Sequence, residues 1–336
     1  MSVLKRVLSR LLIPVERAVT AALYPVCRLR ESLSGTVKVP ILMYHQVGPP
    51  VDGGPPRPDC VSPQSFERQM HAILDAGYRV IALHDLVRIL DAGRLEDLRR
   101  SVVLTFDDGY RGQFVFACPV LQRLRLPSTF FVTTGIVGKP AFFPHLAIQP
   151  AQGGASPPLA WLPLSWDEVK EMARQGIDIG SHAVTHRSLG RLADGEAEIE
   201  VWLSKEALER RAGIRVDLFA YPFGSEAWGD FHRSLQDTLR RSGYRGACTR
   251  AIGRSGPGSD PLALPRIPME ERDGPFRVRC KLAGAFDWVG PFVSLWQRLT
   301  ERDDPGKASI PLEADPALGI MTMPARIDAR MPRAGR

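Results

Sequence analysis

The sequence of 336 residues contains no run of about 18 or more uncharged apolar residues, so we do not expect a membrane-spanning helix. Its most apolar stretch, Leu11 to Val26, is interrupted by two prolines and two charged residues, which are Pro14, Glu16, Arg17 and Pro25. The charges also break what would be the apolar region of a signal peptide, and no Ala-x-Ala-like site follows it. A cleaved signal peptide is therefore disfavoured.

Cysteine is also scarce, and the five cysteines show no Cys-x-x-Cys spacing. They are Cys27, Cys60, Cys118, Cys248 and Cys280. Their odd number argues against a complete disulfide framework. We expect reduced thiols, most of them with structural roles.

Basic charge is concentrated at the N-terminus. The formal net charge of the chain is +7, and the first 30 residues contain six basic residues against one acidic residue. A nucleic-acid-binding protein needs a basic face that runs through its fold. The sequence therefore predicts no nucleic-acid partner.

Residues 1–38 form a basic amphipathic N-terminal segment. Apolar residues recur there at helical spacing with basic residues between them: Val3, Leu4, Val7, Leu8, Leu11 and Leu12, with Lys5, Arg6 and Arg10. A helix of this kind suits peripheral contact with an anionic membrane surface. Docking of the helix on the protein's own core explains the pattern equally well.

The rest of the chain has an ordinary globular composition, with 44% hydrophobic and 24% charged residues. The length allows two domains of about 150 residues or one α/β barrel of about 250 residues. From Val39 onward, short apolar runs alternate with amphipathic segments, which indicates alternating strands and helices. The predicted strands are Ile41–Tyr44, Tyr78–Leu83, Val102–Phe106, Ser128–Thr133, Ile177–Gly180, Leu218–Tyr221, Tyr244–Thr249 and Leu264–Pro268.

Seven or eight strands in this arrangement favour a single (β/α) barrel of the α/β class, which we assign to residues 39–300. Residues 301–336 are rich in proline and lack apolar periodicity. We expect them to form a disordered tail.

Two adjacent carboxylates end one predicted strand. Asp107 and Asp108 follow the buried run Val102–Phe106 and precede Gly109. In a parallel α/β fold the C-terminal ends of the strands face the active site, where two neighbouring acids repel each other unless a cation or base chemistry uses them. Alternatively, one aspartate caps the following helix and the other is solvated.

Two histidines follow another predicted strand. His182 and His186 come after Ile177–Gly180 and are four residues apart. On a helical turn, this spacing aims both imidazoles at one point, as a zinc-like ion requires. The spacing alone is a moderate signal. A carboxylate from the other strand end would supply a third ligand and leave positions open for water and substrate.

At these motifs the sequence resembles the polysaccharide deacetylases, also called carbohydrate esterase family 4 and including chitooligosaccharide deacetylase-like proteins. The similarity runs from about Pro40 to Met269, with Thr105–Gly109 as the first motif, His182–Leu189 as the second and Phe219–Gly224 as the third. The resemblance implies a distorted (β/α) barrel of about seven strands that removes N-acetyl groups from amino-sugar polymers with a divalent metal.

The resemblance also implies roles for individual residues. Asp108, His182 and His186 would hold the metal, and Asp107 would be the catalytic base. Phe223 would donate its backbone N–H to the oxyanion that forms on the acetamide carbonyl. If Phe223 is instead a core aromatic, its N–H would point into the fold.

The third motif departs from the family pattern, because it usually begins with an arginine that pairs with the base. Leu218, Phe219 and Ala220 offer no cation. Arg266, at the end of another predicted strand, is our candidate replacement, because a guanidinium near Asp107 would keep it ionised and orient it. The alternative is that Arg266 is an ordinary surface arginine.

A second departure concerns the general acid, because no Leu-x-x-His follows Gly224. Some relatives, similar to the poly-N-acetylglucosamine deacetylases, have a rearranged motif order in which this histidine comes from the first strand. His45 fits that arrangement, since it follows Ile41–Tyr44 and an imidazole can protonate a leaving amine at neutral pH. A structural role, binding a nearby backbone group, is the alternative.

These observations predict a metal-dependent hydrolase that deacetylates an exopolysaccharide or cell-envelope glycan, with zinc as the expected divalent metal. A hydrolase of a small non-sugar amide and a non-catalytic glycan-binding protein are the alternatives. A cytoplasmic or inner-membrane-associated location is favoured over secretion, because of the charged N-terminal segment.

Overall fold

The computed structural model describes residues 3–33, 35–50, 59–139 and 158–300, and for residues 3–12 it describes the backbone alone. The tail predicted for residues 301–336 lies outside this part of the chain. The division into a segment 1–38 and a domain 39–300 stays a prediction.

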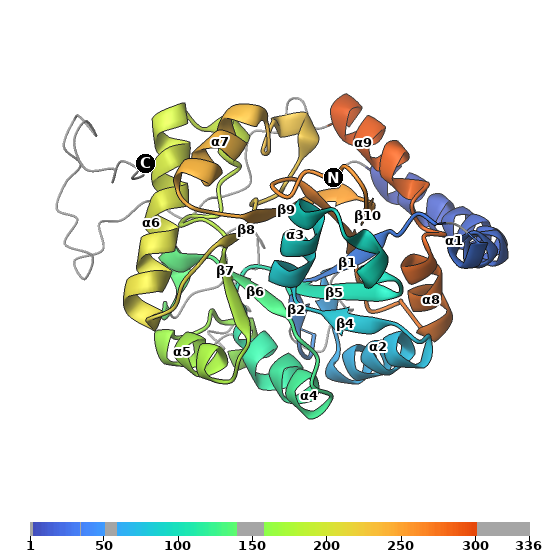
Figure 1. Cartoon of the computed structure of the whole chain (residues 1–336), viewed down its shortest axis with the longest axis horizontal. Coiled ribbons are helices and arrows are strands. Elements are labelled where there is room, and N and C mark those ends of the chain that lie inside the picture. Colours follow the sequence, from blue (N-terminus) through green and yellow to red (C-terminus); the bar gives the residue numbers. More distant parts are fainter. Residues whose placement is uncertain (1–2, 34, 51–58, 140–157, 301–336) are drawn as a thin grey trace.

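Seven parallel strands close into a barrel, which confirms the predicted α/β class and (β/α) barrel (Figure 1). In order around the barrel they are β1 (Val39–Tyr44), β5 (Ser101–Phe106), β6 (Thr129–Val132), β7 (Asp178–Ser181), β8 (Leu218–Ala220), β9 (Gly246–Ile252) and β11 (Leu264–Pro268). The ring closes because Leu42 of β1 aligns with Leu104 of β5 and also with Ile267 of β11. All seven strands were expected from the apolar runs.

The remaining predicted strand, Tyr78–Leu83, lies outside this ring. It is β4 (Arg79–Ile81), which pairs in parallel with the first half of β5. The short β10 (Arg254–Ser255) pairs antiparallel with the start of β1. A separate two-stranded sheet joins β2 (Gln46–Val47) to β3 (Cys60–Val61).

Helices surround the strands (Figure 1). They are α2 (Pro63–Asp75), α3 (Leu83–Ala92), α4 (Cys118–Arg123), α5 (Trp166–Arg174), α6 (Asp194–Ala212), α7 (Arg233–Arg241), α8 (Pro275–Ala283) and α9 (Val289–Thr300). Shorter helical turns cover Leu95–Leu98, Gln113–Ala117, Thr134–Ile136, Leu159–Trp161, Leu189–Arg191 and Glu226–Trp228. Local sequence sets the helix starts: Ser165 and Glu168 form a capping box at the start of α5.

Alternate residues of the barrel strands face its interior, as the two-residue period of a strand requires. Ile41, Val103 and Leu264 belong to one buried cluster, together with apolar side chains of α3 such as Val87. A side chain at Gly246 would place its Cβ 2.5 Å from Val87, so α3 packs closely on the barrel. Figure 1 shows α3 across one end of the barrel. This helix closes the end at which β5 and β9 begin.

The N-terminal helix α1 (Val3–Leu33) is docked on the protein along its described side chains. Glu16 forms an ion pair with Arg277 of α8 at 2.7 Å, and Thr20 accepts a hydrogen bond from the Trp288 indole at 3.3 Å. The ring of Tyr24 packs edge-on against a ring of α8, Phe276, at 5.4 Å. Docking on the protein's own core therefore holds for this part of α1. No helix in the described ranges combines the length and apolar character needed to cross a bilayer.

Candidate active site

A cavity of about 330 Å³ lies at the C-terminal ends of the barrel strands, opposite α3. All seven residues singled out from the sequence line it: His45, Asp107, Asp108, His182, His186, Phe223 and Arg266. Six of them follow β1, β5, β7 or β8, and Arg266 lies in the middle of β11. The fold therefore brings together residues that are up to 221 positions apart, from His45 to Arg266.

Asp108, His182 and His186 form a cluster that fits a metal ion. The Oδ1 atom of Asp108 lies 3.4 Å from Nε2 of His182 and 3.1 Å from Nε2 of His186, and all three side chains are buried. The three ligand atoms lie within 4.8 Å of one another. One carboxylate and two imidazoles on one side of a cavity are a typical donor set for a catalytic zinc site, where the other side stays open.

A backbone contact fixes the orientation of His182. Its Nδ1 lies 2.8 Å from the carbonyl oxygen of Ala220, the last residue of β8. With Nδ1–H donating to that carbonyl, the lone pair of Nε2 faces Asp108. Burial by itself lowers the pKa of His182, but the Asp108 carboxylate, which can accept a hydrogen bond from the protonated ring, and the charge of Asp107 outweigh it and raise the pKa.

The loop that carries the two histidines is not the helical turn expected from their spacing. No helix is assigned between β7 and the turn Leu189–Arg191, and both Ala183 and His186 have left-handed φ angles, of 59° and 57°. The prediction of a helical turn was therefore wrong. Two left-handed residues shape the loop, and both imidazoles lie close to the carboxylate of Asp108.

Glu200 of α6 holds this loop in place. Its carboxylate accepts hydrogen bonds from the backbone N–H of Val184 at 2.8 Å and of Thr185 at 2.9 Å, and also from the Thr185 hydroxyl. Arg187 forms an ion pair with the same carboxylate at 3.2 Å. Glu200 is fully buried. Sequence analysis missed it, because an acid in the middle of a polar helix carries no local sign of a partner in another element.

Asp107 and Arg266 form a two-pronged ion pair inside the barrel mouth. The guanidinium nitrogens lie 2.6 Å and 2.7 Å from the two carboxylate oxygens, and both side chains are buried. Arg266 also donates from Nε to the carbonyl oxygen of Thr249 at 2.8 Å. Arg266 is therefore not an ordinary surface arginine. Burial by itself raises the pKa of Asp107, but the charge of Arg266 outweighs it and lowers the pKa below its usual value.

The half-buried His45 follows β1 and lines the cavity on the side of Asp107. The side-chain amide of Gln113 donates to the carbonyl oxygens of both His45, at 2.8 Å, and Asp107, at 2.5 Å. Gln113 is buried, so it ties the backbones after β1 and β5 to each other. Sequence analysis missed this glutamine too, because its partners are backbone atoms.

Phe223 lies at the wall of the cavity, where it is half-buried. Its ring packs edge-on against His186 at 4.8 Å and against Trp228 at 5.4 Å. Its backbone has a left-handed φ of 60°, and Gly224 follows with a φ of 48°. A Cβ at Gly224 would lie 2.6 Å from the backbone nitrogen of Arg250, so this turn requires glycine. The direction of the Phe223 N–H stays a prediction.

Residues 95–247 match the family model of the polysaccharide deacetylases. Over this range the chain is similar to the polysaccharide deacetylases. The matched range contains the cluster that fits a metal ion, Asp107 and Phe223, whereas His45 and Arg266 lie outside it. The resemblance expected from the three motifs is thus confirmed.

Relatives and solved structures agree with the family. The Bacillus subtilis (strain 168) protein YxkH, whose name assigns it provisionally to the polysaccharide deacetylases, is 27% identical over 233 residues, which are 68% of this chain and 71% of YxkH. The polysaccharide deacetylase BC0361 from Bacillus cereus is 25% identical, with a TM-score of 0.57 over 74% of this chain and 70% of BC0361. The deacetylase PplD from Streptococcus pyogenes shares the fold, with a TM-score of 0.60 and 24% identity over 74% of this chain and 99% of PplD.

Proposed function

We propose that this protein hydrolyses the acetamide groups of N-acetylated amino-sugar residues in an exopolysaccharide or cell-envelope glycan, and that it depends on a divalent metal. The observation that supports this most is that one cavity holds both a candidate base and a cluster that fits a metal ion. Asp107 is paired with Arg266 there, directly beside the cluster that fits a metal ion. A base next to a metal site is the arrangement that metal-assisted hydrolysis needs.

Asp108, His182 and His186 would hold the metal, with zinc as the expected ion. When bound, the ion would supply Lewis-acid activation of water and of the acetamide carbonyl. Asp107 would accept a proton from the water that attacks the carbonyl carbon. Its lowered pKa keeps it in the ionised form that this role requires, and Arg266 fixes the direction of its carboxylate.

The oxygen of the former carbonyl gains negative charge as water adds. The backbone N–H of Phe223 would donate a hydrogen bond to that oxygen, since its turn lies against His186 at the cavity wall. His45 would then protonate the amide nitrogen as the carbon–nitrogen bond breaks. The products are acetate and the free amino sugar.

The sugar chain would lie along the open side of the cavity. Val293 and Gln297 of α9 line the cavity, as does Tyr110, which follows β5. A wall made from an apolar and an amide side chain suits the mixed apolar and hydroxyl surface of a pyranose ring. The glycan class is part of the proposal.

We also propose peripheral contact of the chain with an anionic membrane, and a cytoplasmic or inner-membrane-associated location rather than secretion. The basic residues of the segment 1–38 support the contact. Cell fractionation of a reporter fused to residues 1–38 tests both parts. Release of the reporter into the medium would contradict the location.

The deciding experiment for the activity measures acetate release from N-acetylglucosamine oligomers by the purified protein. We expect release that is lost on chelation and restored by zinc or cobalt. Small linear and cyclic amides serve as the comparison substrates. Release from these amides alone would contradict the glycan substrate, and no release from any substrate by metal-loaded protein would contradict the deacetylase activity.

A further inference from the structure

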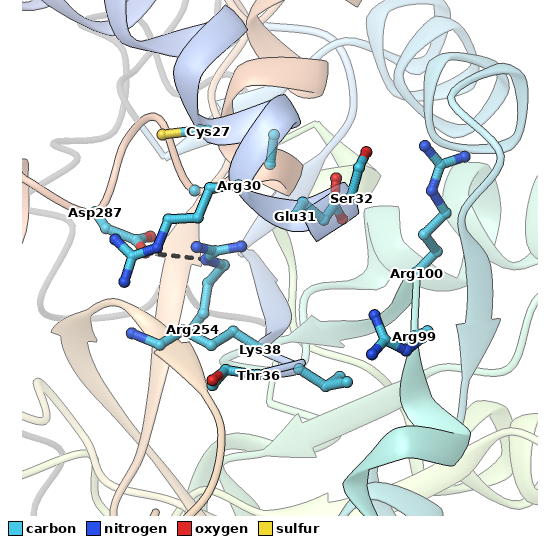
Figure 2. Close-up of a pocket in the computed structure, with 13 residues that line it drawn as sticks. Cys27, Arg30, Glu31, Ser32, Thr36, Lys38, Arg99, Arg100, Arg254 and Asp287 are labelled. Atoms are coloured by element: carbon cyan, nitrogen blue, oxygen red, sulfur yellow. Dashed lines mark hydrogen bonds and ion pairs between the residues drawn. The ribbon is translucent and has the colours of Figure 1, made fainter. Parts of the chain in front are cut away.

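A second cavity, of about 450 Å³, lies at the opposite end of the barrel from the candidate active site (Figure 2). Lys38 immediately precedes β1, and Arg99 and Arg100 immediately precede β5, so the cavity is at the end where these strands begin. His45 and Asp107 follow the other ends of the same two strands. Six residues of a strand span about 20 Å, which separates the two cavities.

The lining of this cavity is strongly basic. Five cationic side chains line it against two carboxylates: Arg30, Lys38, Arg99, Arg100 and Arg254, with Glu31 and Asp287. Figure 2 shows Arg30, Lys38 and Arg254 on one side of the cavity and Arg99 and Arg100 on the other. Cations from three separate parts of the chain thus surround one volume.

Both carboxylates already have cationic or hydroxyl partners. Asp287 accepts from Nε of Arg254 at 3.0 Å, and Glu31 accepts from Arg28 at 2.7 Å and from the Tyr78 hydroxyl. The positive charge of the cavity therefore exceeds what its own carboxylates neutralise. Arginine forks and lysine ammonium groups around a solvent-filled volume are suited to a phosphate group.

An apolar stripe on α1 lies beside this cavity. Five exposed apolar side chains form the stripe, with exposed fractions between 37% and 77%: Val15, Val19, Val26, Leu29 and Leu33. At 3.6 residues per turn they fall within about 80° of one another around the helix axis. Arg30, a cavity residue, lies about 60° from the centre of the stripe. An apolar helix face bordered by cations is the pattern of a helix that lies on an anionic membrane.

We propose that this basic cavity binds the phosphate group of an anionic lipid headgroup, while the apolar stripe of α1 rests on the membrane surface. The inference rests on the membrane contact proposed above and is independent of the deacetylase chemistry. The candidate active site stays separate from the headgroup site, because the two cavities lie at opposite ends of the barrel. A glycan in the aqueous phase could reach it while the protein is bound.

The experiment measures co-sedimentation of the full-length protein with vesicles that contain phosphatidylglycerol, with pure phosphatidylcholine vesicles as the comparison. The test variant is Arg30→Gln with Lys38→Gln, whose side chains are both exposed. Loss of two charges near a membrane should weaken partitioning about thirtyfold. The matched control, Lys170→Gln with Arg174→Gln on α5, removes two exposed charges on a helix away from α1 (Figure 1) and should change partitioning little.

A second pair of variants tests the apolar stripe. Leu29→Gln with Leu33→Gln should weaken vesicle binding, whereas Leu295→Gln with Leu299→Gln on α9 should not, although those leucines are also exposed. Because α9 borders the candidate active site, the opposite result would place that site against the membrane and overturn the inference.

The remaining outcomes separate the sources of the phosphate. Equal binding to both vesicle types, or equal binding by the cavity variant, would overturn the cavity assignment while leaving membrane contact in place. No binding to any vesicle would overturn both. Calorimetric titration with inorganic phosphate tests whether the cavity binds a soluble phosphate. If phosphate binding depends on Arg30 and Lys38 and the protein does not bind vesicles, the cavity is a site for a soluble phosphate instead. In every case acetate release from soluble oligomers tests the deacetylase activity separately.

Discussion

Arg266 and Asp107 lie 159 residues apart in the sequence, yet they meet in two parallel hydrogen bonds of 2.6 Å and 2.7 Å inside the barrel. The inward-facing positions of β11 and the end of β5 make this contact possible. A buried aspartate without this partner would be uncharged over much of the acidic range. The pair therefore explains how the candidate base stays ionised in a buried site.

The first prediction follows from this pair. Replacing Arg266 with methionine removes the largest influence that lowers the pKa of Asp107, so burial is less opposed and that pKa should rise. The acidic limb of the pH profile of kcat/KM should move to higher pH. Stability should fall by about 3–5 kcal/mol, since a buried charge is left without its partner.

The matched control for this prediction is Arg266→Lys, which keeps the positive charge and loses the two-pronged geometry. It should recover part of the stability and leave the acidic limb nearer its original pH. Urea unfolding measures the stability. Acetate release between about pH 4 and pH 9, where carboxylates and imidazoles titrate, gives the pH profile. An acidic limb unmoved in Arg266→Met would remove Arg266 from its proposed role.

The second prediction separates the two adjacent aspartates. Asp107→Asn should retain the bound metal and lower kcat by roughly 10²–10⁴-fold, the range for loss of a general base. Asp108→Asn should instead lose metal, because it removes the charged ligand of the cluster. Elemental analysis of both purified variants, beside a kinetic assay, decides between these roles. Equal metal content in the two variants would refute the ligation by Asp108.

The third prediction concerns Glu200. In Glu200→Gln the carboxylate can no longer accept from Val184, Thr185 and Arg187 together, so the loop with His182 and His186 should loosen. Metal affinity should fall about 10–100-fold, as for other residues that orient metal ligands.

Glu196→Gln is the control for Glu200, because Glu196 lies on the same helix, is exposed and contacts the same Arg187 at 3.8 Å. It should leave metal affinity unchanged. Competition with a coloured chelator measures affinity without any need for turnover. If both variants bind metal as tightly as the unchanged protein, Glu200 has a role in folding alone.

Much of the fold could be predicted from the sequence because it depends on short-range patterns. Short apolar runs predicted every barrel strand. The position of β4 was not accessible, because a run of apolar residues does not say whether a strand enters the ring or pairs beside it. That outcome depends on register with β5, which is a long-range property.

In the candidate site, too, local patterns could be predicted from the sequence and long-range contacts could not. Residue types and spacing indicated the cluster that fits a metal ion and Asp107. Because the third motif lacks its arginine, Arg266 was the predicted partner of Asp107, and the structure pairs the two. The helical turn predicted for His182 and His186 was wrong, because left-handed residues and the distant Glu200 determine the loop. Contacts between a side chain and distant backbone atoms leave no local pattern, which is also why Gln113 was missed.

The last prediction tests His45 as the group that protonates the leaving amine. In His45→Ala, deacetylation of an N-acetylglucosamine oligomer should slow by about 10²–10⁴-fold, because an amine leaves poorly without a proton. Hydrolysis of an activated aryl acetate should change little, since a stabilised phenolate leaves unprotonated.

The control for this prediction is His71→Ala, since His71 is exposed on α2 and should affect neither substrate. Metal content should stay unchanged in both variants, because His45 is not part of the cluster that fits a metal ion. The ratio of the two rates is the decisive quantity, as it cancels differences in active protein. If His45→Ala slows the amide and the aryl ester by the same factor, His45 positions the substrate or the fold and another group must protonate the amine.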